Sequence, residues 1–299
     1  MLSDSRQEWS AILTSYNSIN LIDGAIESAL NQTVLPREVI VVDDCSTDGS
    51  FEYLCEIAKT NPLLQIFRTD RNTGGAAEPR NMAIKEMKTP IGVIFDDDDI
   101  SLPERAKIHL EDLSNGAAVS YVGSLITNPL SMSEEKAASD FLAGRENLQE
   151  LTKQLLLGLR KKNSPQVIVP SSVAAFKKDD LIDLECFDSK VLRREDIDLA
   201  IRLLQKDKKI IGNSTILVKR LITSGDDKSR AWDVECERRV FEKHKSILTR
   251  RYRFAGRCLH KIRHYQANSR SIRAIPFGVI LSLISPSIFT RSLFRWVSR

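Results

Sequence analysis

The sequence has few of the features that define several protein classes. Only five of its 299 residues are cysteine, and no two form a Cys-x-x-Cys pair, so neither a disulfide framework nor a zinc cluster is indicated and a reducing compartment fits best. No basic stretch followed by an apolar core occurs at the start, so we expect no signal peptide. Aromatic residues make up 6% and glycines number 13, while 42% hydrophobic and 28% charged residues are ordinary. Fibrous, disordered and polytopic membrane proteins are therefore excluded.

Acidic residues are absent from the last part of the chain. Residues 243–299 contain 13 lysines and arginines and no aspartate or glutamate, whereas the preceding part carries 31 basic and 40 acidic side chains. Such asymmetry indicates a polyanionic partner, either nucleic acid or a membrane surface. Together with the length, it predicts a catalytic domain over residues 1–225 and a basic helical region over 226–299.

The apolar patterns alternate between those of strands and helices. Residues 39–42 are a continuous β-branched run, typical of a strand buried on both faces. The alternation predicts an α/β fold with a mostly parallel sheet, which binds ligands beyond the carboxyl ends of its strands. We expect strands at 9–16, 39–42, 63–67, 91–95, 117–127 and 166–176, helices at 20–31, 51–58, 76–88, 146–161 and 191–206, and a loop at 128–145.

Polar clusters follow three of the expected strands, at residues 14–17, 43–44 and 96–99. The last cluster is a run of four aspartates, whose carboxylates repel one another unless a cation or protons neutralise them. Mg²⁺ and Mn²⁺ are bound by such carboxylates together with substrate phosphates. A solvated acidic loop or a helix cap is the alternative interpretation of the run taken alone.

Five stretches in order resemble family 2 glycosyltransferases of the GT-A fold, and the resemblance spans residues 9–222. It implies a Rossmann-like mixed sheet flanked by helices that binds a nucleotide-diphosphate sugar, here with a carboxyl-terminal helical basic extension. The stretches are ILTSYNSINLIDGAIESALNQT (12–33), VIVVDDCSTDGS (39–50), NTGGAAEPRNMAI (72–84), FDDDDISLPER (95–105) and FDSKVLRREDIDLAIRL (187–203).

The resemblance implies a nucleoside site. Thr14 and Tyr16 match positions that contact the nucleoside, and Asp44 matches the carboxylate that reads the base. A carboxylate can accept a hydrogen bond from the N3–H of uracil, which cytosine lacks, so Asp44 favours uridine or thymidine diphosphates. The alternative for Asp44 is capping of the next helix. Cys45 stands where the family commonly has glycine.

A second matching segment contains Gly75, Arg80 and Asn81. Gly75 permits close approach of the backbone to a ligand. Two roles stay open for Arg80, contact with the nucleotide or its diphosphate and pairing with the aspartate cluster.

The aspartate run matches the family's DxD motif through Asp96 and Asp98. The resemblance implies that Asp98, with Asp96, binds Mn²⁺ or Mg²⁺. Asp97 is expected to contact the donor, and Asp99 to support the metal ligands or contact the sugar.

Glu195 and Asp196 match the family's ED motif, which makes Asp196 the general base and Glu195 a supporting residue. The alternative is an acid at a helix N-terminus that interacts with the helix dipole. Some family members carry a further metal-binding histidine after this helix, and residues 217–229 contain none.

Residues 274–290 form an uncharged stretch of 17 residues, at the lower edge of the roughly 17–25 that span a bilayer. Pro276, Gly278 and Pro286 weaken a spanning helix further. With the arginines at 291 and 295, the stretch predicts an interfacial anchor on anionic lipid. Packing on the catalytic domain and a contact between two copies are the alternatives, and no motif supports nucleic acid.

These features together predict a metal-dependent, inverting glycosyltransferase that moves a sugar, most simply from a UDP-sugar, to a hydroxyl of a glycan or lipid-linked acceptor. We expect it on the cytoplasmic face of a membrane. A homo-oligomer is compatible with the sequence. Two alternatives are a membrane-bound scaffold with a disabled site and a sugar-phosphate nucleotidyltransferase. The latter needs a Gly-rich, Arg-containing loop after the first strand, and residues 14–20 contain neither residue.

Overall fold

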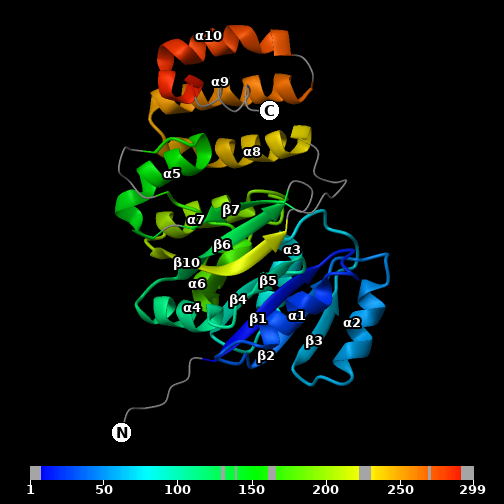
Figure 1. The fold of residues 1–299 in the computed structure, drawn as a ribbon. Helices are drawn as coiled ribbons and strands as arrows, with labels where there is room; N and C mark the ends of the chain where they lie inside the picture. The colour runs from blue at the N-terminus through cyan, green and yellow to red at the C-terminus, as the bar shows by residue number, and fades with distance from the viewer. Residues whose placement is uncertain are drawn as a thin grey trace. The chain divides into compact units, whose positions relative to one another are not determined.

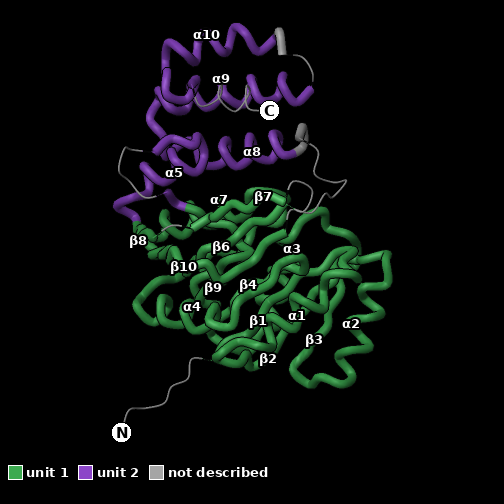
Figure 2. The backbone as a smooth tube through the Cα atoms, viewed as in Figure 1, with its two compact units in different colours: residues 1–144, 168–223 green, residues 145–167, 224–299 purple. Residues whose placement is uncertain are grey.

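The computed structural model describes residues 8–128, 132–138, 140–160, 166–221, 230–268 and 271–290. The chain forms two compact units, residues 1–144 with 168–223 and residues 145–167 with 224–299 (Figure 2). The second unit thus takes in a segment from the middle of the chain as well as the carboxyl-terminal region. Nothing in the sequence pattern indicated that residues 145–167 group with the later helices.

The first unit is built on a mixed sheet (Figure 1), and its strand order is β3-β2-β1-β4-β9-β6-β10-β5. The four strands β1 to β4 are parallel, β9 is antiparallel to both of its neighbours, and β10 is parallel to β6. This arrangement confirms the predicted α/β fold. The bounds are β1 Trp9–Ser15, β2 Glu38–Asp43, β3 Leu64–Arg68, β4 Ile91–Asp96, β5 Asp99–Ser101, β6 Val119–Asn128, β9 Ala174–Lys177 and β10 Ile210–Leu221.

Both faces of the central strands are buried, as the continuous apolar runs require. Successive side chains of a strand point to opposite faces. On β1, Ala11 and Leu13 join a core cluster with α1, while Ile12 between them is buried outside that cluster. The helices of this unit are α1 Ile22–Leu30, α2 Ser50–Ala58, α3 Ala77–Glu86, α4 Arg105–Ser114, α6 Lys178–Ile182 and α7 Glu195–Gln205.

Two parts of the middle region differ from the sequence prediction. The expected loop at 128–145 contains β7 (Ser133–Ala137) and β8 (Phe141–Ala143). The exposed side chains of β7 leave no apolar alternation to detect. The expected strand at 166–176 is instead a 3-10 turn, η2 (Ser171–Val173), followed by β9, and Pro170 precedes the turn in an extended conformation.

The second unit is helical. Its close packing requires Gly256 of α9, because a Cβ there would lie 2.3 Å from the Phe241 ring of α8 and 3.1 Å from Leu157 of α5. No helix of the described residues is both long and apolar enough to cross a membrane. The bounds are η1 Arg145–Asn147, α5 Leu148–Leu157, α8 Arg230–His244, η3 Lys245–Ile247, α9 Arg250–Ala267, η4 Ser271–Ala274 and α10 Ile275–Ile284.

Candidate active site

Four strand ends bring the predicted polar clusters to one edge of the sheet. Thr14 of β1 lies opposite Asp96 of β4, and Ser15 lies opposite Asp43 of β2. Asp43 in turn pairs with Arg68 at the end of β3. The parallel register therefore makes neighbours of the clusters at 14–17, 43–44 and 96–99, at the edge where open α/β sheets bind ligands.

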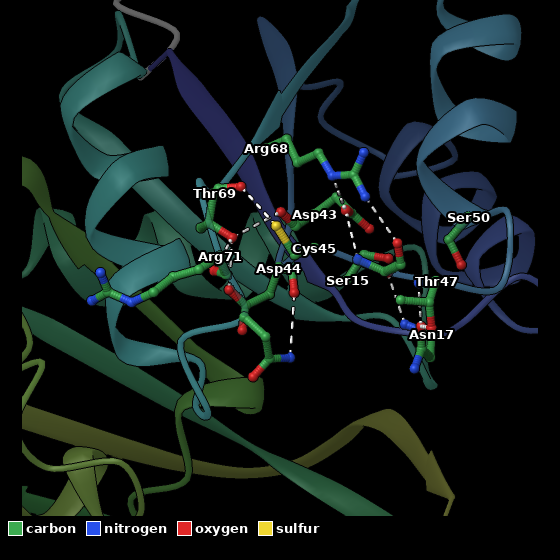
Figure 3. Close-up of polar contacts among 12 residues, drawn as sticks. Ser15, Asn17, Asp43, Asp44, Cys45, Thr47, Ser50, Arg68, Thr69 and Arg71 are labelled. Carbon is green, nitrogen blue, oxygen red and sulfur yellow. Dashed lines mark hydrogen bonds and ion pairs between the residues drawn. The ribbon is translucent and has the colours of Figure 1, made fainter.

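Asp44 follows β2 and binds the loop after β3. Its carboxylate accepts hydrogen bonds from Thr69 Oγ1 at 2.8 Å and from Thr73 N and Oγ1 at 3.0 and 2.9 Å. Figure 3 shows Asp44 beside Thr69. At the start of α2, Asp48 accepts a hydrogen bond from Ser50 N at 3.0 Å. Asp44 is thus ordered at the rim of the site, and Asp48 takes the capping contact.

The loops around Asp44 use left-handed backbone conformations. Cys45 has φ +57°, which explains why glycine suits this position. Its Sγ donates to Thr69 O at 2.9 Å, a contact that a glycine cannot make. Asn17 has φ +50° and accepts a hydrogen bond from Thr47 N at 2.8 Å (Figure 3). The loops after β1, β2 and β3 are therefore held to one another.

The aspartate run forms the turn between β4 and β5. Carboxylate oxygens of Asp96, Asp98 and Asp99 lie within 4.8 Å of one another. Three close oxygen ligands fit Mg²⁺ or Mn²⁺, which are hard cations. Asp97 instead accepts a hydrogen bond from Tyr16 N at 3.0 Å and so joins the turn to β1. Asp99, which the sequence placed in support of the metal ligands, is one of these three close carboxylates.

Burial keeps protons on part of this acidic turn. It raises the pKa of Asp97 to about 7 and that of Asp99 to about 8, and the charge of Asp96 raises the pKa of both acids. Arg220 of β10, whose Nε is 3.4 Å from Asp99 Oδ2, opposes the rise at Asp99. A nearby divalent charge favours the ionised carboxylates, so the turn has the electrostatics of a cation site.

Arg80 of α3 connects the acidic turn to α7. The residue is only 4% exposed, and its Nη2 donates to Asp96 Oδ1 at 2.8 Å while Nη1 donates to Glu195 Oε1 at 2.7 Å. Of the two roles predicted for Arg80, pairing with the aspartate cluster is the one seen. The next residue, Asn81, exchanges two hydrogen bonds with the backbone of Phe187, at 2.7 and 2.9 Å.

Asp196 lies in the first turn of α7, half-buried beside Glu195. Burial, and then the charge of Glu195, raise the pKa of Asp196 to about 7. Asp196 is among the residues that line a small cavity, with Tyr121 and Ser171. A carboxylate that titrates near neutrality can act as a base at physiological pH.

Gly75, Thr14 and Tyr16 also lie at this edge of the sheet. A Cβ at Gly75 would be 2.5 Å from Leu192 O, so the close approach that this glycine permits is to the segment before α7. Tyr16 is 48% exposed and free to contact a ligand at the rim, and Thr14 is half-buried. Their part in nucleotide binding stays a prediction.

Sequence reasoning missed three residues at the site. Arg220 reaches Asp99 from β10, and Tyr121 and Ser171 share the cavity of Asp196. None of the three belongs to a recognisable motif, since each reaches the site only through the pairing of β9, β6 and β10.

The strand order and the acidic turn at the sheet edge are those of a GT-A-type fold. Residues 10–185, more than half of the chain, match Glycosyl transferase family 2. The chain therefore belongs to glycosyltransferase family 2.

Bacterial cell-surface enzymes are among its relatives. The chain is 31% identical over 115 residues to a putative teichuronic acid biosynthesis glycosyltransferase, TuaG, of Bacillus subtilis, covering 38% of this chain and 45% of that protein. It is 33% identical over 103 residues to the poly(ribitol-phosphate) beta-N-acetylglucosaminyltransferase TarS of Staphylococcus aureus, covering 33% and 18%. The matches span less than two thirds of each relative.

Solved structures share the fold. S. aureus TarS 1-349 in complex with UDP-GlcNAc has a TM-score of 0.61 at 17% identity, covering 94% of this chain and 82% of that one. The mannosyltransferase PcManGT of Pyrobaculum calidifontis, in complex with GDP-Man and Mn²⁺, has a TM-score of 0.54 at 18% identity, covering 97% and 75%.

Proposed function

We propose that this protein is a metal-dependent, inverting glycosyltransferase that moves a sugar from a UDP-sugar to an acceptor hydroxyl in the synthesis of a surface polysaccharide or glycolipid. The observation that carries the proposal is that Arg80 makes two ion pairs. They join Asp96 of the acidic turn to Glu195, the neighbour of Asp196. A donor diphosphate held at the turn and an acceptor beside Asp196 are then adjacent.

Asp44, Thr14, Tyr16 and Gly75 form the proposed nucleoside side of the site. The carboxylate of Asp44 is held by Thr69 and Thr73, and a fixed acceptor suits the N3–H of uracil. The TarS structure with UDP-GlcNAc supports this nucleotide, although PcManGT was solved with GDP-Man. We expect calorimetry to show tighter binding of UDP than of CDP. The Asp44→Asn variant should show a smaller preference for UDP.

Asp98 and Asp96, with Asp99 beside them, would hold Mn²⁺ or Mg²⁺. When bound, the cation supplies charge that binds the diphosphate and stabilises it as a leaving group. Arg80 already offers both guanidinium nitrogens to Asp96 and Glu195, so it orients the acidic turn toward the base. Asp97 fixes the turn against β1 through Tyr16 N.

Asp196 is the proposed base. As the acceptor oxygen forms its bond to the anomeric carbon, the bond from that carbon to the diphosphate breaks and the hydroxyl proton passes to Asp196. One displacement of this kind inverts the configuration. A base matched to neutral pH contributes on the order of 10²–10⁴-fold, and the raised pKa of Asp196, about 7, suits that role.

The relatives support a surface-polymer acceptor. TuaG is named for teichuronic acid biosynthesis and TarS for transfer to poly(ribitol-phosphate). A glycan or lipid-linked acceptor is therefore the class that we propose, handled on the cytoplasmic face of the membrane.

A membrane-binding role of the carboxyl-terminal region is supported by α10. The helix has no charged residue, and it packs on α9 through Phe277, which stacks on Tyr265 at 6.0 Å. The opposite face is apolar and exposed at Ile275, Val279 and Leu283, by 60%, 56% and 79%. Ten residues span about 15 Å, half of a bilayer core, so the helix suits the interface rather than a span.

Arginines lie at both ends of this exposed face. Arg273 is exposed just before α10, and Arg251 of α9 donates to Ile284 O at 2.8 Å at its end. Basic side chains beside an apolar face are attracted to anionic headgroups. The predicted continuation at residues 291–297 lies outside the described residues.

Two experiments test the enzyme proposal. Calorimetry measures UDP binding in the presence of Mn²⁺ and in the presence of a chelator. A nucleotide-release assay then screens candidate sugar donors. We expect Mn²⁺-dependent UDP binding, transfer from at least one UDP-sugar, and loss of transfer with retained UDP affinity in Asp196→Asn. Metal-independent binding or none at all would favour the scaffold, and release of pyrophosphate from a nucleoside triphosphate would favour the nucleotidyltransferase. Undiminished transfer by Asp196→Asn would remove Asp196 from its role.

A further inference from the structure

A fully buried arginine is bonded to both ends of the acidic turn. Arg105 is the first residue of α4 and has no exposed surface. Its Nη2 donates to Ile94 O at 2.7 Å, and its Nη1 donates to Ser101 Oγ at 2.8 Å. Ile94 precedes the aspartate run in β4, and Ser101 follows it in β5. One guanidinium therefore holds the chain on either side of the four aspartates.

The guanidinium of Arg105 makes further contacts in other directions. Nη2 also donates to Ser172 O of η2 at 2.8 Å, and Nε donates to Nε2 of His109 at 3.4 Å. The guanidinium carbon lies 4.8 Å from the centre of the Phe95 ring. Arginine has five N–H donors in a planar fork, whereas lysine has three on a single nitrogen. These acceptors lie around the fork, so a lysine cannot reach them all at once.

A chain of buried polar groups fixes the orientation of the guanidinium through its Nε. Because Nε2 of His109 accepts from Arg105, the imidazole proton is on Nδ1, which donates to Ser120 Oγ at 2.9 Å. Ser120 in turn donates to Asp112 Oδ2 at 2.7 Å. His109 and Ser120 are fully buried. A buried network in which every group has its partner specifies a single arrangement.

The backbone that carries Arg105 is also held in place. Arg105 N donates to Leu102 O at 3.1 Å, and Leu102 N donates to Leu217 O of β10 at 2.8 Å. The side chain of Gln32, which follows α1, donates to Leu102 O at 3.1 Å and accepts from Ala106 N at 2.9 Å. With its backbone anchored and its fork bonded, Arg105 offers the acidic turn a rigid support.

We propose that Arg105 is a positioning residue for the cation site, because it fixes the acidic turn in the conformation that brings Asp96, Asp98 and Asp99 together. The inference rests on the proposed role of this turn in cation binding. The carboxylates of these three aspartates lie within 4.8 Å of one another. Arg105 acts through the residues on either side of the run, Ile94 and Ser101, and is not itself a ligand.

Loss of the fork would leave the three carboxylates present but would release the turn that makes them converge. Contacts of this outer kind typically contribute on the order of 10–100-fold to metal affinity. Stability alone is a poor explanation for the arginine, since apolar side chains of similar volume commonly serve a buried site as well as a charge does. The fork is explained by the turn that it holds.

The test compares Arg105→Lys with the wild-type chain, each at a temperature at which it is folded. Lysine keeps the positive charge and loses the fork. Calorimetric titration measures Mn²⁺ binding without nucleotide, and amide hydrogen exchange of residues 95–102 is followed without metal. We expect the dissociation constant for Mn²⁺ to rise on the order of 10–100-fold and the exchange of these amides to become faster.

Ser101→Ala removes only one of the contacts between Arg105 and the turn. It should change the Mn²⁺ affinity and the exchange in the same direction by less, and it decides the matter if Arg105→Lys does not fold. Ser120→Ala is the matched control, because it breaks the same buried network beyond His109. It should lower the urea midpoint and leave both the Mn²⁺ affinity and the exchange of residues 95–102 unchanged.

Two results would overturn the inference. One is wild-type Mn²⁺ affinity in the folded Arg105→Lys and Ser101→Ala variants, and the other is an equal loss of affinity in Ser120→Ala, which would reveal a purely structural role. The first result would leave the proposed cation site standing. If the wild type itself binds no Mn²⁺, the proposed cation site is wrong, and unchanged exchange in Arg105→Lys would separately show that Arg105 does not hold the turn.

Discussion

Asp96 and Glu195 bind the two terminal nitrogens of one arginine, Arg80, at 2.8 and 2.7 Å. Asp96 ends β4 at the acidic turn, and Glu195 begins the helix that carries Asp196. The shared guanidinium therefore couples the geometry of the proposed cation site to that of the proposed base.

Replacing Arg80 should destabilise the protein strongly. Arg80→Met leaves two carboxylates facing each other without their buried cation, and loss of one partner of a buried pair costs about 3–5 kcal/mol. Arg238→Met on α8 is the matched control, because its pair with Glu235 is exposed and is worth about 1 kcal/mol or less. Chemical denaturation measures both, and equal losses would contradict the structural importance of Arg80.

The pH dependence of stability should report Asp196. Its folded-state pKa is raised to about 7 from an ordinary 3.8, so between these values the folded protein holds a proton that the unfolded chain has lost. This stabilisation is complete below about pH 4 and is lost as the pH rises to about 7. Three pH units correspond to at most about 4 kcal/mol. Asp196→Asn should flatten this decline in urea titrations; an unaltered slope would contradict the raised pKa.

Mn²⁺ should stabilise the protein more at pH 8 than at pH 5. Asp97 and Asp99 hold protons at the lower pH because burial raises their pKa values to about 7 and 8, and protons compete with the cation for carboxylates. Thermal unfolding with Mn²⁺ and with EDTA measures the effect. Asp98→Ala should abolish most of it, and an equal Mn²⁺ response in that variant would place the cation elsewhere.

Gly75→Ala should destabilise the first unit. The new Cβ would lie 2.5 Å from the Leu192 carbonyl oxygen, so the segment before α7 must move, and overpacking of this kind costs about 1–3 kcal/mol. Gly278→Ala in α10 is the control, since its Cβ meets only a ring carbon at 3.6 Å. A fall in the urea midpoint of Gly75→Ala without one in Gly278→Ala is expected.

A charge on the exposed face of α10 should reduce binding to anionic lipid. Leu283→Asp introduces a carboxylate at a leucine that is 79% exposed, and Leu35→Asp makes the same change at a leucine of the first unit that is 68% exposed. Co-sedimentation with phosphatidylglycerol vesicles should fall several-fold for the first variant only. Equal binding of both variants would remove α10 from the membrane contact, and a changed mass in solution would point to a second copy instead.

The strand ends were predictable because local patterns mark them. Apolar runs such as Val39–Val42 end abruptly in acids, and the structure places those acids at one sheet edge. The pairing of Arg80 with Glu195 was not predictable, since this partner lies far along the chain.

Residues without a local pattern escaped prediction. Tyr121 has the pattern of an ordinary strand residue, and only the fold brings it to the same cavity as Ser171 of η2 and Asp196 of α7. The exposed β7 strand, Ser133–Ala137, carries no apolar alternation because nothing covers its side chains within the described residues.

The place of α5 decides how the chain can be shortened. The helix lies in sequence between the two segments of the first unit but packs with α8 and α9, and its Leu157 touches the position of Gly256. Truncation after residue 223 would strip α5 of these helices and turn Leu151, Leu156 and Leu157 out to water. The carboxyl-terminal unit should therefore be tested by point substitutions on α10. Removal of the last helices would leave a poorly folded protein that is prone to aggregate.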